Sequence, residues 1–346
     1  MKVVVLGASG FIGGAVVRSL IDAGHTVRAA ARDPEELDLP EHAERARAEL
    51  GDPTSIADAA SGMDVVVCAA GIVSPRAAKR ALTWTHVAGA ENLVNACKHA
   101  EVRRLVHVTC TDVTLHAGDR IHWDEDRPTT GYAFGDRARS LQLGEELILS
   151  TSGPELEAVS IRASWVWGPG DTSRLPGLLR EARSGGIQLV GDGRTYFATT
   201  YIDHLAEAIL AGLDAENAAG RPYHVVDPTF QHARDFFFAL SEALGLPRPK
   251  ESAPFSVSWP LARLRGKGPG GLTPDEMLQR GKSTLFDFSA ACGKLAYDPK
   301  VSMEDGLRAL AEWITAQGGI DAVASMEKQP PAAESVEAQV RAAGGD

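Results

Sequence analysis

The sequence predicts an α/β fold in which helices cover both faces of a doubly wound parallel sheet. Short apolar runs alternate with helix-compatible segments through the first two-thirds of the 346-residue chain, a pattern typical of parallel strands buried on both faces. The first apolar run ends in a glycine-rich loop that opens a helix. After about residue 165, proline and glycine become frequent and helical segments dominate, which indicates a smaller C-terminal lobe.

Each expected element follows from its local pattern. Apolar runs predict strands at residues 3–6, 27–31, 65–67, 105–108 and 158–161, and helices fit residues 14–23, 53–60, 87–99 and 139–149. In the second part, helices are expected at 233–244 and 303–313. We therefore expect a core at 1–165, with about 195–228 returning to it, and a lobe at 166–316. Residues 317–346, rich in Ala, Gly, Glu and Gln, are expected to be a flexible or weakly helical tail.

Composition excludes several classes of protein. The chain has 35 Lys and Arg against 46 Asp and Glu, a formal charge of −11, and such an acidic surface repels nucleic-acid phosphates and anionic lipid. The four cysteines form no CxxC pair, so neither structural zinc nor a disulfide framework is expected. We find no signal peptide and no apolar run long enough to span a bilayer. The expected class is a soluble, cytoplasmic enzyme without a nucleic-acid partner.

The loop after the first strand has the spacing of a dinucleotide-binding motif. Gly7 permits a tight turn, Gly10 lets the backbone approach a pyrophosphate, and Gly13 lets the helix pack close to the strand. The helix N-terminus then offers free N–H groups to the phosphates. An ordinary strand-to-helix turn is the alternative, but the strand before the loop and the helix after it favour a Rossmann fold that binds a nicotinamide dinucleotide. The predicted contacts in this loop are Gly7, Ser9, Gly10, Phe11, Ile12 and Gly13.

The end of the second strand indicates which dinucleotide is bound. Arg32 stands where an acidic residue would accept hydrogen bonds from the adenosine ribose of NAD. A guanidinium suits a 2′-phosphate, so NADP(H) is preferred. Asp33 follows at once, which keeps NAD(H) possible, and a solvated surface arginine is the alternative reading of Arg32.

Several separated segments together resemble the extended short-chain dehydrogenase/reductase family, also known as the NAD-dependent epimerase/dehydratase superfamily. They are the glycine loop, Glu49-Leu50 with Asp52, Ala69-Ala70-Gly71, 124–128, 161–171 and 201–206. Segments 236–238, 245–249 and 295–299 of the second lobe are similar to the 3β-hydroxysteroid and sterol-carboxylate dehydrogenase branch. The resemblance implies a Rossmann fold, a substrate-binding lobe, and cofactor contacts from Glu49, Leu50, Ala69, Ala70, Gly71, Thr109, Ser164 and Val166. A homodimer through the fourth and fifth helices is possible by the same resemblance.

The resemblance fails at the residues that carry the family's proton transfer. That family uses a tyrosine, a lysine four residues later, a serine or threonine, and an asparagine. This chain has five tyrosines, none followed by lysine at the fourth position. Aligning residues 137–147 with the family's active-site helix places Arg137 in the tyrosine position and Leu141 in the lysine position. Cys110 then takes the serine position and His86 the asparagine position.

The other candidate catalytic residues each have a functional and a structural interpretation. Tyr132, five residues before Arg137, and Thr111, one residue after Cys110, are further candidate proton donors. Arg137 either binds or polarises a substrate group or is a solvated arginine. Cys110 is either a reactive thiol or an inert buried one, and His86 is either an acid–base group or a satisfied helix histidine.

Two other groups of side chains suggest a substrate pocket and a metal site. Trp165 and Trp167, beside the last of these strands, either wall an apolar substrate pocket or belong to the core. The histidines and aspartates between His107 and Asp124 lack metal-ligand spacing, so no metal is expected.

Three functions fit these observations. The first is an atypical NADP(H)-dependent oxidoreductase acting on a small hydrophobic molecule, namely a bulky, largely apolar ketone, alcohol or conjugated ring. The second is a redox-inactive cofactor-binding sensor or partner protein. The third is a non-redox isomerase, cyclase or dehydratase that keeps the nucleotide as structure.

Overall fold

A parallel sheet of seven strands forms the centre of the protein. The computed structural model describes residues 1–40, 43–74, 76–129 and 133–326. The strand order is β10-β7-β5-β4-β1-β2-β3, and each neighbouring pair is parallel. The strands are β1 Lys2–Leu6, β2 Thr26–Ala31, β3 Glu44–Arg47, β4 Val65–Cys68, β5 Arg104–Cys110, β7 Glu157–Ala163 and β10 Arg221–Val225. This sheet confirms the predicted doubly wound α/β class.

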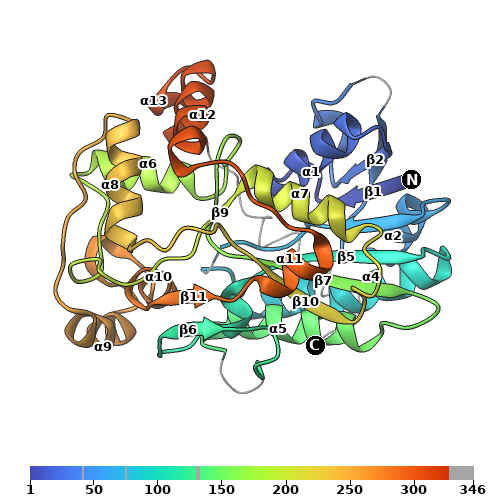
Figure 1. The fold of residues 1–346 in the computed structure, drawn as a ribbon, viewed down its shortest axis with the longest axis horizontal. Coiled ribbons are helices and arrows are strands. Elements are labelled where there is room, and N and C mark those ends of the chain that lie inside the picture. The colour runs from blue at the N-terminus through green and yellow to red at the C-terminus, as the bar shows by residue number, and fades with distance from the viewer. Residues whose placement is uncertain (41–42, 75, 130–132, 327–346) are drawn as a thin grey trace.

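Helices cover both faces of this sheet (Figure 1). On one face, Val17 of α1 and Leu205 of α7 join the core formed by one side of the strands. On the other face, Ile56, Leu93 and Ile148 do the same from α2, α4 and α5. The first face carries α1 Phe11–Asp22, α7 Ile202–Gly212 and α11 Ser289–Leu295, and the second carries α2 Pro53–Ala60, α4 Gly89–His99 and α5 Gly135–Ser150.

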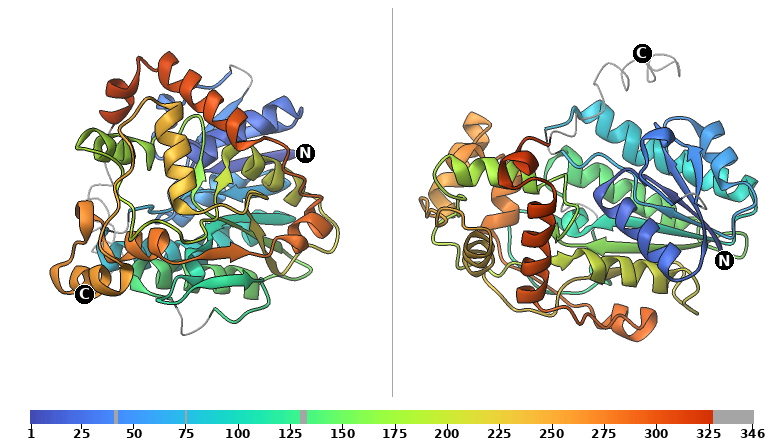
Figure 2. Two further views of the ribbon diagram at one scale, coloured as in Figure 1. Left: turned by 60° about the vertical axis from the view of Figure 1, so that its left-hand side comes forward. Right: turned by 90° about the horizontal axis from the view of Figure 1, so that it is seen from above.

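The remaining helices gather on one side of the sheet (Figures 1 and 2), where two smaller apolar clusters accompany a second core. Phe236, Phe237, Leu179 and Leu310 are buried in it. These helices are α6 Leu175–Arg183, α8 Ala233–Ala243, α9 Phe255–Arg265, α10 Pro274–Gly281, α12 Met303–Ala316 and α13 Ile320–Ala324. Two small ladders accompany them, β8 Val166–Trp167 with β9 Thr200–Tyr201, and β6 Arg120–Trp123 with β11 Thr284–Phe286.

Several element boundaries differ from the sequence prediction. α1 begins at Phe11 because Gly10 is its extended N-cap. α5 begins at Gly135, whose φ of +85° turns the chain into the helix. The expected helix at 87–99 is preceded by α3 Lys79–Thr83 and a π-helical turn at Trp84–Ala88. The edge strand β3 was not expected because its sequence, ERAR, contains no apolar run.

The start of the expected tail is a packed helix. Val323 and Ala324 of α13 are buried against the second core, and Arg180 of α6 donates a hydrogen bond to the carbonyl of Ala324 over 2.6 Å. Residues 327–346 lie outside the described part of the chain. None of the helices in the described ranges combines the length and the apolar character that crossing a membrane requires.

Candidate functional site

The glycine loop between β1 and α1 has the geometry that a dinucleotide pyrophosphate requires. Gly7 adopts φ +84°, and a Cβ there would lie 2.8 Å from the backbone of Ala70. A Cβ on Gly13 would lie only 2.1 Å from the carbonyl oxygen of Gly7. No side chain caps the N-terminus of α1, and its first turn contains no acidic residue. The first N–H groups of the helix are thus available to an anion.

The other predicted cofactor contacts lie at the same edge of the sheet. All seven strands are parallel, so the loops that follow β1, β2, β4, β5 and β7 emerge together. Arg32 follows β2 and is exposed, and Ala69, Ala70 and Gly71 follow β4 beside the Gly7 turn. β1 has β2 on one side and β4 on the other, so this is the point at which the winding of the sheet reverses.

Residues on either side of this crevice complete the predicted cofactor surface. Glu49 and Leu50 lie between β3 and α2, and Leu50 packs closely on Gly89 of α4. Thr109 is on β5. Ser164 and Val166 follow β7, where the Ser164 N–H donates to Thr200 Oγ1 over 2.9 Å. The residues present fit a nicotinamide dinucleotide laid across the crevice.

The register of α5 is fixed by a buried ion pair. Glu145 accepts hydrogen bonds from Arg162 of β7 at 2.6–3.0 Å, and both side chains are buried. With α5 held this way, Arg137 Nη2 lies 3.5 Å from the Sγ atom of Cys110. Leu141 follows one helical turn later and is half-buried. The structure thus places Arg137 beside Cys110, and the assignment of Arg137 and Leu141 to the family's tyrosine and lysine positions stays a prediction from the sequence.

His86 is held by hydrogen bonds at both ring nitrogens. The Ile72 N–H donates to Nε2 over 3.2 Å, so Nδ1 carries the hydrogen and donates to Ser140 Oγ over 2.8 Å. The Ser140 hydroxyl in turn donates to the carbonyl of Arg137. Burial, together with the charge of Arg137, lowers the pKa of His86 to about 3. The imidazole is neutral and fully bonded, an arrangement that opposes proton transfer and positions α5 against the loop after β4.

Arg137 is paired with a carboxylate that the sequence analysis did not single out. Its Nη1 atom donates to Asp112 Oδ2 over 2.6 Å, and Gln279 Nε2 donates to the same oxygen over 2.6 Å. Burial raises the pKa of Asp112, but Arg137, Arg174 and Arg120 together hold it below its usual range. Burial also raises the pKa of the Cys110 thiol, with Asp112 adding to the rise and Arg137 opposing it, and this net rise disfavours a nucleophilic thiolate.

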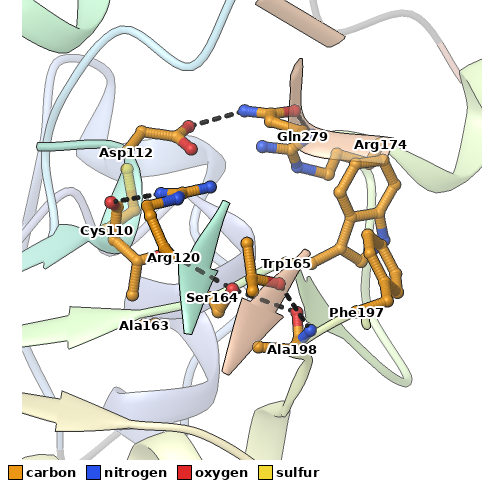
Figure 3. Close-up of a pocket in the computed structure, with 12 residues that line it drawn as sticks. Cys110, Asp112, Arg120, Ala163, Ser164, Trp165, Arg174, Phe197, Ala198 and Gln279 are labelled. Atoms are coloured by element: carbon orange, nitrogen blue, oxygen red, sulfur yellow. Dashed lines mark hydrogen bonds between the residues drawn. The ribbon is translucent and has the colours of Figure 1, made fainter. Parts of the chain in front are cut away.

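These groups border a pocket beside the end of β7 (Figure 3). It contains about 340 Å³ of empty space that includes open solvent. Aromatic and small apolar side chains form one part of its wall and charged or polar groups the other. The lining residues are Cys110, Thr111, Asp112, Arg120, Ala163, Ser164, Trp165, Arg174, Phe197, Ala198, Gln279 and Thr284.

The structure separates the remaining candidates. Trp165 lines the pocket, whereas Trp167 is buried and packs on Tyr201 and Phe236. Thr111 lies in the pocket and donates to Ser164 Oγ over 3.2 Å. Tyr132 lies outside the described residues. Within the described part of the chain, no group of three His, Cys, Asp or Glu side chains is arranged to hold a metal.

Three of the polar residues that line this pocket have no role that the sequence predicted. Arg120 comes from β6, Arg174 precedes α6, and Gln279 comes from α10. None of them belongs to a motif that a single sequence reveals.

The fold and the residue pattern agree with one family. Residues 4–256 match the 3-beta hydroxysteroid dehydrogenase/isomerase family. The chain belongs to this family. This confirms the resemblance predicted from the glycine loop and the second-lobe segments.

Two relatives align over nearly their whole length. A 2-alkyl-3-oxoalkanoate reductase of Stenotrophomonas maltophilia is 30% identical over 327 residues, covering 90% of this chain and 98% of that protein. A sterol-4-alpha-carboxylate 3-dehydrogenase (decarboxylating) of Schizosaccharomyces pombe is 26% identical over 334 residues, covering 90% and 97%. By their names, one of these relatives is a reductase and the other a dehydrogenase.

Solved structures show the same fold at lower sequence identity. The UDP-glucuronic acid 4-epimerase from Bacillus cereus, solved in complex with NAD, superposes with a TM-score of 0.71 at 20% identity. The superposition covers 91% of this chain and 99% of the epimerase.

Proposed function

We propose that this protein is an NADP(H)-dependent oxidoreductase that acts on a bulky, largely apolar ketone or alcohol, without the usual tyrosine and lysine. The observation that carries the proposal is a cofactor crevice that opens, at one sheet edge, beside a pocket lined by Cys110 and Asp112, both of which contact Arg137. The activities of the relatives support an oxidoreductase.

Residues of this chain would bind each part of the cofactor. The N–H groups at the start of α1 would bind the pyrophosphate, and Glu49 and Leu50 would contact the adenosine. Arg32 is exposed at the carboxyl end of β2 and forms no ion pair within the described residues, which leaves its guanidinium to a 2′-phosphate. Bound NADP(H) supplies or accepts the hydride.

Arg137 would stabilise negative charge on the substrate oxygen. Although burial opposes its charge, the ion pair and hydrogen bond with Asp112 hold the pKa of Arg137 above its usual range, so the guanidinium stays charged and does not act as a proton donor. A fixed donor aimed at a developing oxyanion contributes about 10²–10³-fold to the rate in well-studied enzymes. The proton would then come from water, directly or through the Thr111 hydroxyl, because the chain from Thr111 through Ser164 ends at the Ala198 carbonyl, which has no proton to supply.

Leu141 favours a second candidate function. A leucine cannot hold the nicotinamide ribose by a charged hydrogen bond, and the charge of Arg137 is already offset by Asp112. A redox-inactive cofactor-binding protein with the same fold is consistent with these two residues. A non-redox isomerase, cyclase or dehydratase is the remaining alternative.

One experiment separates these functions. NADPH binding is measured by fluorescence titration, and NADPH oxidation is followed by absorbance over a panel of apolar ketones with product analysis. We expect oxidation at one equivalent per product, a loss of about 10²-fold or more in kcat/KM for Arg137→Met, and little change for Arg139→Met, an exposed arginine on the same helix. Tight NADPH binding without turnover of any ketone would favour the redox-inactive protein. Product without NADPH consumption would favour the isomerase class.

A further inference from the structure

Helix α9 is apolar on the face that it turns to solvent as well as on the face that it buries. On its inner face, Ala262 is buried in one apolar cluster with Met277 of α10. On its outer face, Val257, Leu261 and Leu264 recur at helical spacing and are 61%, 41% and 85% exposed. A surface helix ordinarily presents polar side chains to water. This outer stripe, Val257, Leu261 and Leu264, therefore indicates a surface that a partner covers.

The outer stripe is a concentration of exposed apolar side chains. In the described part of the chain, eight large apolar side chains are exposed, and three of them belong to this one helix. Single exposed apolar residues are ordinary, whereas neighbouring ones mark an interaction surface. α9 lies at an outer corner of the lobe, away from the seven-stranded sheet (Figures 1 and 2). Its outer face is thus accessible to a large partner.

The segment that contains the outer stripe is positively charged in a protein that is acidic overall. No acidic residue occurs between Glu251 and Asp275, whereas Arg263, Arg265 and Lys267 all lie there. These three side chains are exposed, and within the described residues none of them forms an ion pair with a carboxylate. The net charge of −11 predicts repulsion from anionic lipid, but screening beyond about 8–10 Å makes the local charge decisive at a contact surface.

We propose that α9 is a peripheral docking helix for an anionic membrane surface, into which it inserts Val257, Leu261 and Leu264 while Arg265 and Lys267 contact lipid phosphates. The helix has 11 residues, roughly half of what spanning a bilayer requires, so it lies in the plane of the interface. Its buried apolar area and its attraction to anionic headgroups act together there. A second copy of this chain is a poorer occupant, because a two-fold contact would bring the same cations face to face.

α9 also packs on the helix that borders the pocket. Trp259 of α9 contacts the apolar cluster that contains Leu278 of α10, and the next residue, Gln279, lines the pocket. A bilayer docked on α9 therefore lies one helix away from the pocket, and apolar molecules partition into a bilayer. Docking goes beyond the proposed oxidoreductase function and does not depend on it.

Vesicle flotation of the full-length protein tests the docking helix. One set of vesicles contains phosphatidylcholine alone, and the other an equal mixture of phosphatidylcholine and phosphatidylglycerol. We expect at least about tenfold tighter binding to the anionic vesicles, weakened by salt. Leu264→Glu should weaken binding at least about tenfold, and the 85% exposure of Leu264 means that folding does not need this side chain. Phe230→Glu, at a 75% exposed residue between β10 and α8, is the matched control and should bind normally.

A pair of charge reversals tests the electrostatic part. Arg265→Glu with Lys267→Glu should abolish the preference for anionic vesicles. Lys300→Glu with Arg308→Glu changes the net charge equally at exposed positions outside α9 and should retain that preference. Unchanged melting temperatures verify that each variant is folded. Equal losses for the two pairs would contradict a local docking surface.

Three further outcomes are decisive. Failure to float with either kind of vesicle, or normal binding by Leu264→Glu, would overturn the proposal. A dimer in light scattering that Leu264→Glu converts to a monomer, without vesicle binding, would assign the outer stripe to a second copy of the chain. Vesicle binding by a protein that oxidises no NADPH would reject the oxidoreductase but retain the docking helix.

Discussion

Arg137 and Asp112 form a buried ion pair in which Nη1 lies 2.6 Å from Oδ2. The arginine comes from α5 and the aspartate from the short 3₁₀ turn after β5. The pair therefore links α5, the helix that aligns with the family's active-site helix, to the end of β5, where Cys110 lies. If Arg137 occupies the family's tyrosine position, as the sequence predicts, a permanent charge stands where the family has a titrating phenol.

Breaking this ion pair should destabilise the fold as well as the site. Arg137→Met leaves Asp112 as an uncompensated buried charge, and Asp112→Leu does the same to Arg137. Removing one partner of a buried pair costs about 3–5 kcal/mol of unfolding free energy, which urea denaturation measures. The double variant should lose less than the sum of the two single variants. Additive losses would show that the two side chains do not interact.

Gly13 and Gly14 give a matched test of the cofactor loop. Gly13→Ala places a Cβ 2.1 Å from the Gly7 carbonyl oxygen, so we expect the loop to shift and NADPH affinity to fall by more than about tenfold, with stability reduced by about 1–3 kcal/mol. At Gly14 the nearest atom is 3.4 Å away. Gly14→Ala should bind NADPH normally and gain up to about 1 kcal/mol, because alanine favours a helix. Fluorescence titration and thermal unfolding measure both effects, and similar behaviour of the two variants would contradict this account.

Arg32 should decide between the two nicotinamide cofactors. If its guanidinium binds the 2′-phosphate, Arg32→Ala loses charge-assisted hydrogen bonds worth about 1.5–3 kcal/mol, or roughly 10- to 150-fold in NADPH affinity. NADH affinity should change by less than twofold or so, since NADH lacks that phosphate. Arg194→Ala is the control for overall charge. A parallel fall in both affinities would mean that Arg32 does not recognise the 2′-phosphate.

Asp275 should make stability depend on pH in the opposite direction to most carboxylates. It lies on the first turn of α10 against Gly135, and burial, with the charge of Asp112, raises its pKa from 3.8 to about 6. Between these two pH values the folded protein binds more protons at this site than the unfolded chain, so this contribution falls as pH rises. Asp275→Asn should therefore gain stability relative to wild type from pH 4 to pH 7 in urea unfolding.

Asp287 is the control for that measurement. Hydrogen bonds from Ser289 lower the pKa of Asp287, so its contribution is present above the usual aspartate pKa and is lost as pH falls through the folded value. Asp287→Asn should therefore be less stable than wild type at pH 7, with the difference shrinking in acid. A difference for Asp275→Asn that does not vary with pH would show that Asp275 has an ordinary pKa.

The nucleotide-binding half was predictable because its signals are local. Val3, Val4 and Val5 are fully buried, and an uninterrupted apolar run is how a strand covered on both faces is recognised. The edge strands are different. β3 and β10 contain charged or polar residues, because an edge strand is less enclosed. The π-helical turn at Trp84–Ala88 has no apolar period that sequence reasoning can detect.

The sequence could indicate site residues only at positions that align with the family's active-site helix and the strand before it. That alignment grouped Arg137 with Cys110, and their Nη2 and Sγ atoms lie 3.5 Å apart. It could not show that Asp112 pairs with Arg137, because many polar residues follow a strand. Arg120, Arg174 and Gln279 come from three distant segments, and only folding brings them to one pocket. The bonded state of His86 likewise depends on Ile72 and Ser140, which are remote in the chain.

The ladder between β6 and β11 has a consequence for how such proteins diversify. It pairs Thr284 with Arg120 and Phe286 with Trp123, so the chain leaving α10 returns directly to the segment that carries Arg120. Asp112 and Arg120 precede this long excursion, while Arg174 and Gln279 lie within it. A recombination event that exchanged residues 166–283 between relatives would keep the glycine loop and eight of the twelve lining residues, and it would also exchange α7 and the edge strand β10. It would replace the other four in one step, so the substrate could change while the glycine loop that binds the pyrophosphate stays the same.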